Sequence, residues 1–345
     1  MRTIEWKEGT VTTIDQTKLP TETSLLKMRE CREVASAIKD MKIRGAPLIG
    51  VAAAYGLALT AYHSRVGEKS ELIKEIEHSA EILKKTRPTA VNLFWAVDRV
   101  VKRARETLGS ARVVAEIVVD EAEKMANEDV EANRNIGRYG AKLIDYGDTI
   151  LTHCNAGKLA TVDYGTALGV IRAAWEEHKK IRVMATETRP KLQGARLTAY
   201  ELKSDGIPVK LITDSMVGYV ISKQLVNKVV VGADRIVRDA VVNKIGTYPI
   251  AVLAHEHGVP FYVAAPTSTF DLSSSAKDVV VEERSPREVT HFYLTRIAPE
   301  GIEALNPAFD VTPSKYVSAI ICETGVLSIA QLQELANGSN KGFKS

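Results

Sequence analysis

The spacing of hydrophobic residues divides the 345-residue chain into two parts. Residues 1–20 alternate weakly between polar and apolar positions and end at Pro20, which predicts a short pair of strands. From about residue 22 to residue 143, apolar positions recur every three or four residues, as on one face of a helix. The residues with this spacing are Leu25, Met28, Val34, Ile38 and Met41, and later Val113, Val118, Ala122, Met125 and Val130. After its opening strands, this part is therefore predicted to be helical.

Beyond residue 143 the pattern changes to short β-branched and apolar runs separated by segments of helix length. The runs cover residues 149–152, 181–185, 209–212, 229–231 and 261–264, with a further strand near 318–322 and a helix near 328–336. Strands that alternate with helices in this way predict parallel β-α-β units. We therefore expect an α/β protein with a mainly helical domain over residues 1–143 and a mostly parallel sheet in a second domain over residues 144–345.

Composition and charge favour a small molecule as the partner. Hydrophobic residues make up 45% of the chain and charged residues 26%, as in a globular protein with a substantial core. The net charge is +3, and basic residues are interleaved with acidic ones, so no surface for nucleic acid or membrane is expected. The N-terminus lacks an apolar signal segment, and the most apolar stretch, residues 47–62, contains two glycines and is predicted to be too short to span a bilayer. A cytoplasmic enzyme is predicted.

The number of cysteines and the absence of several known catalytic motifs limit the kinds of reaction that this protein is expected to catalyse. Cys31, Cys154 and Cys322 are too few and too scattered for a disulfide framework, although a bridge involving Cys31 or Cys322 stays open if the source is a hyperthermophile. The chain has no glycine-rich dinucleotide motif, P-loop, nucleophile elbow or zinc-protease motif. His255-Glu-His257 stand late in a predicted helix, where adjacent side chains do not converge on one ion, so a solvated polar face is predicted instead of a metal site.

Cys154 stands at the end of a predicted strand and is followed by the small-residue turn Asn155-Ala-Gly-Lys158. Such a turn lets backbone N–H groups approach an anion, and open α/β sheets bind ligands at this edge. Two interpretations stay open from this residue alone. One is an acid–base or nucleophilic role, and the other is a buried structural cysteine, which is about as frequent. His153 is expected to point away from Cys154, because successive strand side chains face opposite sides.

Asp234 ends the apolar run that begins at Val229. A strand of this kind brings a carboxyl group into surroundings of low polarity, which raise the pKa of a carboxyl and produce a general acid. A helix N-cap is an equally good interpretation of Asp234 by itself.

Two arginines precede apolar helices. Arg44 stands in the turn Arg44-Gly-Ala-Pro47, and Arg87 stands in Arg87-Pro-Thr89. The planar guanidinium group matches the oxygen atoms of a phosphate, so either turn is a candidate phosphate site. An exposed surface position is the alternative for both.

Several longer segments follow one another in a fixed order across nearly the whole chain. They are Ile43-Arg-Gly-Ala-Pro47, Arg87-Pro-Thr-Ala-Val-Asn-Leu-Phe-Trp95, Leu151-Thr-His-Cys-Asn-Ala-Gly157, Thr186-Glu-Thr-Arg-Pro190 with Gln193-Gly-Ala-Arg196, Gly232-Ala-Asp-Arg-Ile236, Asn243-Lys-Ile-Gly-Thr-Tyr248 and Asn306-Pro-Ala-Phe-Asp310. With these segments the chain resembles the methylthioribose-1-phosphate isomerases of methionine salvage. The whole set is far more specific than any single motif.

The resemblance implies a helical N-terminal domain and a Rossmann-like C-terminal domain, assembled as a homodimer, with a small sugar phosphate as substrate and no metal or organic cofactor. It implies that Asp234 is the proton donor and that Cys154 is the second catalytic residue. The substrate contacts that it implies are Arg44, Gly45, Ala46, Arg87, Gln193, Asn243 and Lys244.

The reaction implied is conversion of 5-methylthioribose 1-phosphate to 5-methylthioribulose 1-phosphate. The phosphate on the anomeric carbon keeps the ring closed, so an acid at the ring oxygen and a second group over C1 and C2 are needed. Ribose 1,5-bisphosphate and 5-deoxyribose 1-phosphate are alternative substrates, although the apolar segment Val91-Asn-Leu-Phe-Trp95 favours a methylthio group over a second phosphate. Non-catalytic regulatory subunits of the translation-initiation guanine-nucleotide exchange factor share the fold, and the presence of both Cys154 and Asp234 argues against that alternative.

Overall fold

The computed structural model describes residues 2–338 and forms two compact units. Among these residues, unit 1 comprises 2–134 and Gly157–Gly165, and unit 2 comprises Asn135–Ala156 and 166–338. The division between the units differs from the expected boundary at residue 143, because it lies inside one continuous helix, α5 (Ala111–Ala141). A boundary within a helix leaves no break in the hydrophobic pattern.

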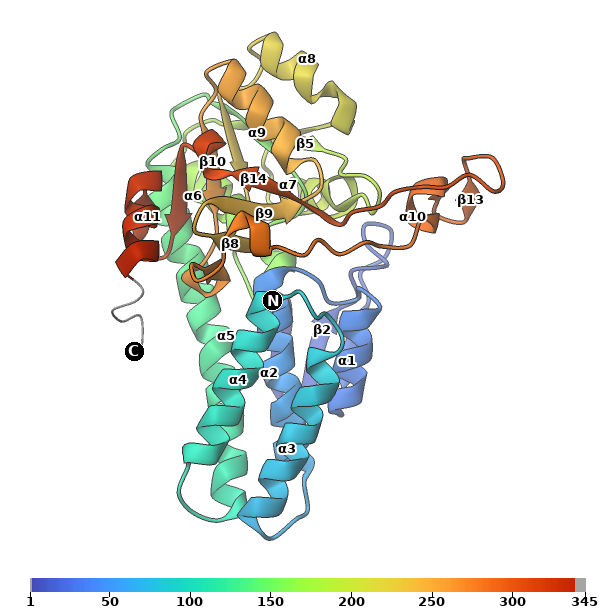
Figure 1. Cartoon of the computed structure of the whole chain (residues 1–345), viewed down its shortest axis with the longest axis vertical. Coiled ribbons are helices and arrows are strands. Elements are labelled where there is room, and N and C mark those ends of the chain that lie inside the picture. The colour runs from blue at the N-terminus through green and yellow to red at the C-terminus, as the bar shows by residue number, and fades with distance from the viewer. Residues whose placement is uncertain (1, 339–345) are drawn as a thin grey trace. The chain divides into compact units, whose positions relative to one another are not determined.

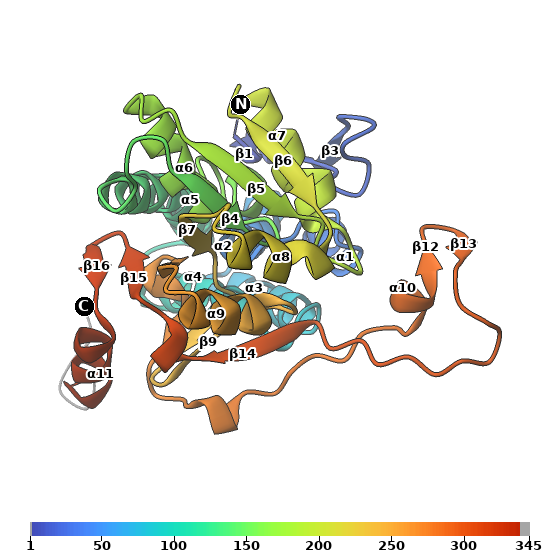
Figure 2. The ribbon, with the colours of Figure 1, turned by 90° about the horizontal axis from the view of Figure 1, so that it is seen from above.

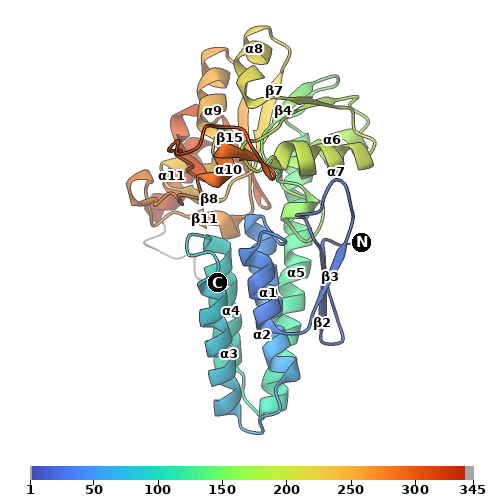
Figure 3. The same cartoon turned by 90° about the vertical axis from the view of Figure 1, so that its right-hand side faces the viewer.

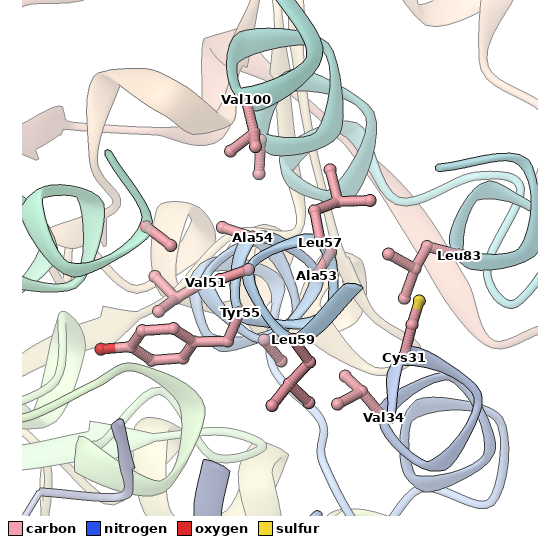
Figure 4. Close-up of a cluster of buried hydrophobic side chains, with 14 of the residues drawn as sticks. Cys31, Val34, Val51, Ala53, Ala54, Tyr55, Leu57, Leu59, Leu83 and Val100 are labelled. Atoms are coloured by element: carbon pink, nitrogen blue, oxygen red, sulfur yellow. The ribbon is translucent and has the colours of Figure 1, made fainter. Parts of the chain in front are cut away.

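Unit 1 is a helical bundle with α2 as its central helix (Figure 1). Its helices besides α5 are α1 (Cys31–Lys39), α2 (Ala46–His63), α3 (Lys69–Lys84) and α4 (Val91–Glu106). Apolar side chains leave α2 in several directions, among them Val51, Leu57 and Leu59 (Figure 4). A helix that is apolar all round is stable only when it is covered on every side.

The length of α2 corrects one expectation. With 18 residues and a mean hydropathy of 1.2, α2 is long and apolar enough to cross a membrane, so the prediction that this stretch is too short was wrong. However, 78% of the helix is buried inside the protein, as in the core helix of a globular protein.

A three-stranded antiparallel sheet packs on this bundle (Figure 3). The predicted strand pair is confirmed as β1 (Ile4–Lys7) and β2 (Thr10–Ile14), and β3 (Leu25–Met28) completes the sheet. The helical interpretation of Leu25 and Met28 was wrong, because Leu25 and Lys27 are exposed whereas Met28 is buried, which is the alternation of a strand.

The segment Gly157–Gly165 leaves the fold of unit 2 and packs within unit 1. The side chain of Gln16 donates to the carbonyl oxygen of Leu159 at 2.7 Å, and the backbone N–H of Val162 donates to Asp129 Oδ2 at 2.7 Å. Burial raises the pKa of Asp129 to about 7. The segment therefore supplies part of the core of unit 1, which also contains Val162.

Unit 2 is built on a seven-stranded sheet with the order β16-β15-β10-β7-β4-β5-β6 (Figure 2). Its strands are β4 (Thr149–Thr152), β5 (Arg182–Thr186), β6 (Val209–Ile212), β7 (Lys228–Val231), β10 (Phe261–Ala264), β15 (Ala319–Cys322) and β16 (Gly325–Leu327). All neighbours are parallel except β16, so the predicted Rossmann-like, mostly parallel sheet is confirmed. The strand order reverses direction between β4 and β7, which is where such sheets bind ligands.

Helices cover both faces of this sheet. One face carries α6 (Ala167–Glu176), α7 (Ala199–Ser204) and the last turns of α5, and the other carries α8 (Val217–Ser222), α9 (Thr247–Glu256) and α11 (Ile329–Gly338). Neighbouring strand residues face opposite sides: Ile150 belongs to the core of the first face and Leu151 to the core of the second. Burial on both faces explains why these strands read as continuous apolar runs.

A second sheet and a projecting arm were not predicted. The sheet has the order β11-β8-β9-β14, formed by β11 (Phe270–Asp271), β8 (Arg235–Val237), β9 (Ala240–Lys244) and β14 (Phe309–Pro313). The arm carries α10 (Arg287–Thr290), β12 (His291–Phe292) and β13 (Thr295–Arg296), and both Figure 1 and Figure 2 show it standing away from the sheets. These strands have only two to five residues each, which is too short to produce a clear periodicity.

Candidate functional site

Cys154 and Asp234 follow the two strands on either side of the reversal point. Their strands, β4 and β7, are hydrogen-bonded neighbours, with Leu151 paired to Val229. Beyond the strands the two segments stay in contact, because a Cβ atom added at Gly232 would lie only 2.6 Å from the Cβ of Ala156. The structure therefore places the two predicted catalytic residues at adjacent strand ends, where ligands of such sheets bind.

The backbone of Cys154 has an unusual, well-fixed conformation. Its φ is +62°, in the left-handed region that side chains other than glycine seldom adopt. The N–H group donates to Thr188 Oγ1 at 3.0 Å, and the carbonyl oxygen accepts from Thr198 Oγ1 at 2.6 Å. The side chain is only half-buried. A backbone conformation that is unfavourable in free energy, and that hydrogen bonds hold on both sides of the residue, is typical of functional positions.

The loop after β5 supports Cys154 and is itself tightly held. Thr188 also has a positive φ, +65°, which is rare for a β-branched residue. Asp214, at the end of β6, accepts the backbone N–H groups of Thr188 at 2.8 Å and of Arg189 at 2.7 Å. A Cβ atom at Gly194 would lie 1.8 Å from the carbonyl oxygen of Thr186, so only glycine allows the following π-helix, Gly194–Thr198, to pack on this loop.

A buried polar network lies behind the turn that follows Cys154. Asn155 Nδ2 donates to Thr198 Oγ1 at 3.2 Å and to Glu201 Oε1 at 2.9 Å. Glu201, fully buried, forms an ion pair with Arg172 at 2.7 Å, and Arg172 also contacts Asp205 at 2.6 Å. Buried charges are tolerated when they are paired and hydrogen-bonded in this way. The sequence reasoning missed this network.

The second sheet brings Asn243 beside Asp234. The N–H group of Asp234 donates to the carbonyl oxygen of Val242 at 2.9 Å, and Arg235 is paired with Val242 across β8 and β9. Asn243 directly follows Val242 in β9 and is paired with Asp310 on β14. Directly opposed residues project from the same face of a sheet. Asn243 and Asp310 therefore project from one face, next to the residue that holds the backbone of Asp234.

Further buried polar groups of unit 2 belong to Lys244, Gln193 and Asp310. Lys244 Nζ donates to the carbonyl oxygen of Ala308 at 2.6 Å and lies 5.0 Å from the centre of the Phe309 ring. Gln193 is 5% exposed, and its Oε1 atom is buried without a hydrogen-bond partner within residues 2–338. Burial raises the pKa of Asp310 to about 6, although Tyr248 and Gly246 donate backbone N–H groups to it. Asp310 was not among the predicted site residues.

The other predicted substrate contacts gather at one end of the bundle in unit 1. Arg44, Gly45 and Ala46 lead into α2, and Arg87 precedes α4 and reaches Met41 Sδ at 3.4 Å. The N-terminal turns of α2 and α4 are in contact, because a Cβ at Gly50 would lie 2.9 Å from the carbonyl oxygen of Asn92. Gly45 has a φ of +100° and packs against the backbone of Ala160, so a side chain there is excluded. Two arginines beside two helix N-termini form a group suited to an anion.

The remaining cysteines and the histidine pair have no role in this arrangement. Cys31, Cys154 and Cys322 are all free thiols in this structure. Burial raises the pKa of Cys31 to about 11, which makes its thiol unreactive. The segment from His255 to His257 is exposed at the end of α9, as predicted.

The sequence and the fold both match known proteins over most of their length. Residues 42–329 match the initiation factor 2 subunit family. The methylthioribose-1-phosphate isomerase of Acetivibrio thermocellus is 53% identical over 330 residues, which cover 95% of this chain and 96% of that protein.

Two crystal structures match nearly the whole chain. That of 5-methylthioribose 1-phosphate isomerase from Pyrococcus horikoshii has a TM-score of 0.92 and 47% identity, covering 99% of this chain and 96% of that one. That of a protein from Archaeoglobus fulgidus, described as the delta subunit of translation initiation factor eIF-2B, has a TM-score of 0.87 and 50% identity, covering 98% and 99%. Each match therefore runs through both units.

Proposed function

Because the chain belongs to the initiation factor 2 subunit family, we propose that it is the member which converts 5-methylthioribose 1-phosphate to 5-methylthioribulose 1-phosphate in methionine salvage. The observation that supports this most directly is the placement of Cys154 and Asp234 at adjacent strand ends beside the reversal point of the sheet. The 53% identity to the Acetivibrio thermocellus isomerase supports the same reaction. A homodimer in the cytoplasm is part of the proposal.

The proposed mechanism divides the reaction between the two residues. Asp234 donates a proton to the ring oxygen, which weakens the bond from that oxygen to C1 and opens the ring. Hydrogen then moves from C2 to C1, next to Cys154, and the C2 hydroxyl releases its proton, which restores the acid form of Asp234 and leaves a ketone at C2 with the phosphate retained. Arg44 and Arg87 bind the phosphate through charge-assisted hydrogen bonds, which fix the sugar in a reactive orientation.

A non-catalytic regulatory subunit is the second candidate function. The 50% identity to the Archaeoglobus fulgidus protein described as an initiation factor subunit favours it. Such a subunit needs neither an acid nor a thiol at the carboxyl edge of the sheet. The strained, doubly hydrogen-bonded conformation of Cys154 therefore favours the enzyme.

A product assay with three substrates tests the proposal. We expect the purified protein to isomerise methylthioribose 1-phosphate in preference to 5-deoxyribose 1-phosphate and ribose 1,5-bisphosphate, and to keep its activity after exhaustive chelation with EDTA. No product from any of the three substrates would favour the regulatory subunit. Loss of activity with EDTA that a divalent ion restores would show that the cofactor-free mechanism is wrong.

Replacing either arginine of unit 1 should weaken substrate binding without unfolding the protein. Each charge-assisted hydrogen bond contributes about 1.5–3 kcal/mol, so KM should rise at least about tenfold in Arg44→Ala and in Arg87→Ala. Steady-state kinetics and circular dichroism measure the two effects. Arg112→Ala is the matched control, because Arg112 is exposed on α5 and pairs only with Glu116 among the described ion pairs. A parental KM in both variants would place the phosphate site elsewhere.

A further inference from the structure

A chain of buried side chains connects Cys154 to the loop after β9. His153 Nε2 lies 2.9 Å from the carbonyl oxygen of Ile245, and His153 Nδ1 lies 2.7 Å from Thr186 Oγ1. Thr186 Oγ1 lies 3.1 Å from Thr188 Oγ1, which accepts the N–H group of Cys154 at 3.0 Å. Both threonines are completely buried, and His153 is 2% exposed. The two hydrogen bonds that join His153, Thr186 and Thr188 are therefore shielded from solvent.

The carbonyl group at one end of this series of hydrogen bonds determines which group donates and which accepts at every link. A carbonyl oxygen only accepts, so His153 Nε2 carries the hydrogen that it donates to Ile245. Burial lowers the pKa of His153, so the ring is neutral and its Nδ1 atom accepts the hydroxyl hydrogen of Thr186. The Thr188 hydroxyl hydrogen then points back to residue 186, where both the hydroxyl and the carbonyl oxygen can accept it. The lone pairs of Thr188 Oγ1 are thus left for Cys154.

We propose that His153, Thr186 and Thr188 are positioning residues for Cys154: their one-way hydrogen bonds hold its backbone at a positive φ and thereby set the direction of its thiol. The proposal rests on the proposed catalytic role of Cys154. The same series of hydrogen bonds extends to the loop that follows Asn243 and Lys244. In this loop, a Cβ at Gly246 would lie 2.9 Å from the His153 ring. His153 therefore fixes the distance between the β4 end and the β9 end of the site.

The sharpest test compares two substitutions of Thr188. Thr188→Val keeps the shape and the β-branch but removes the hydroxyl oxygen that accepts the Cys154 N–H group, whereas Thr188→Ser keeps the hydroxyl. We expect kcat of Thr188→Val to fall about tenfold to a hundredfold with little change in KM, because a small displacement of a reacting group is enough for such a loss. Thr188→Ser should retain most of the parental kcat. Thr186→Val and Thr186→Ser repeat the comparison one link further away, in case Thr188→Val does not fold.

A second readout needs no turnover. Alkylation of Cys154 by iodoacetamide, located by mass spectrometry, should be about tenfold faster in Thr188→Val than in Thr188→Ser, because the lost hydrogen bond favours local opening. The buried Cys31 and Cys322 serve as internal controls. Equal alkylation rates and equal kcat values for the valine and serine variants at both positions would overturn the proposal. If Cys154→Ser turns over at the parental rate, the proposed catalytic role of Cys154 is wrong. The alkylation rates alone then decide whether His153, Thr186 and Thr188 position this residue.

Discussion

Asp234→Asn is expected to lose at least about a hundredfold in turnover while binding substrate almost normally, since this loss is the lower end of what a positioned acid contributes. The substitution keeps the size of the side chain. The backbone hydrogen bond from residue 234 to Val242 does not involve the carboxyl group, so the position of the residue is preserved. An amide, however, cannot supply an acidic proton to the ring oxygen. Steady-state kinetics with methylthioribose 1-phosphate separate the effects on kcat and KM.

The matched control for this variant is Asp120→Asn, which makes the same change at an exposed position on α5. It should behave like the parent. If Asp234→Asn also turns over at the parental rate, the acid assignment is wrong, and Glu187 and Asp214 at neighbouring strand ends become the candidates. Of these two, Glu187 is the better one, because both carboxylate oxygens of Asp214 already accept backbone N–H groups.

Cys154→Ser should be impaired by a similar factor, at least about a hundredfold in kcat. A hydroxyl group ionises far less readily than a thiol, so it is a poor proton carrier at neutral pH. Cys322→Ser is the matched control. The sulfur of Cys322 contacts Thr324 Oγ1 and the carbonyl oxygen of Gly325, and a serine hydroxyl can keep both contacts. Parental turnover in Cys154→Ser would exclude a chemical role for the thiol.

Substrate deuterated at C2 separates two routes for the hydrogen that moves to C1. If Cys154 carries a proton from C2 to C1, deuterium exchanges with solvent and is partly lost from the product. Complete retention at C1 would instead indicate direct hydride transfer, in which Cys154 contributes to the surroundings of the migrating hydrogen without carrying it. Mass spectrometry of the product measures the retained deuterium.

The sequence predicts the parallel sheet because its strands are buried on both faces. Residues 229–231 are all valine and all buried, so the run is visible without any knowledge of its neighbours. In contrast, β3 is exposed at alternate positions, and the chance spacing of Leu25 and Met28 imitates a helix. The short strands β8 and β9 pair with each other, and their outer neighbours, β11 and β14, lie far along the chain, so no local pattern predicts the sheet.

The candidate site shows the same contrast. Cys154 and Asp234 are predictable because each ends an apolar run, and the carboxyl ends of parallel strands meet at one edge. Their supports are not predictable in this way. Thr188 lies 34 residues from Cys154, and Glu201 lies 46 residues from Asn155, so only the folded chain brings the partners together.

The segment Gly157–Gly165 has a consequence for how this protein can be divided. Because it belongs to unit 1 but is inserted in the sequence of unit 2, no single cut in the gene yields the two units intact. A chain that ends at Arg134 would leave the carboxyl group of Asp129 and the side chain of Gln16 without the backbone groups that they bind. Exchange of a whole unit between relatives would need the interleaved piece to be transferred as well. Recombination by simple fusion is thereby disfavoured, and the two units are expected to be inherited together.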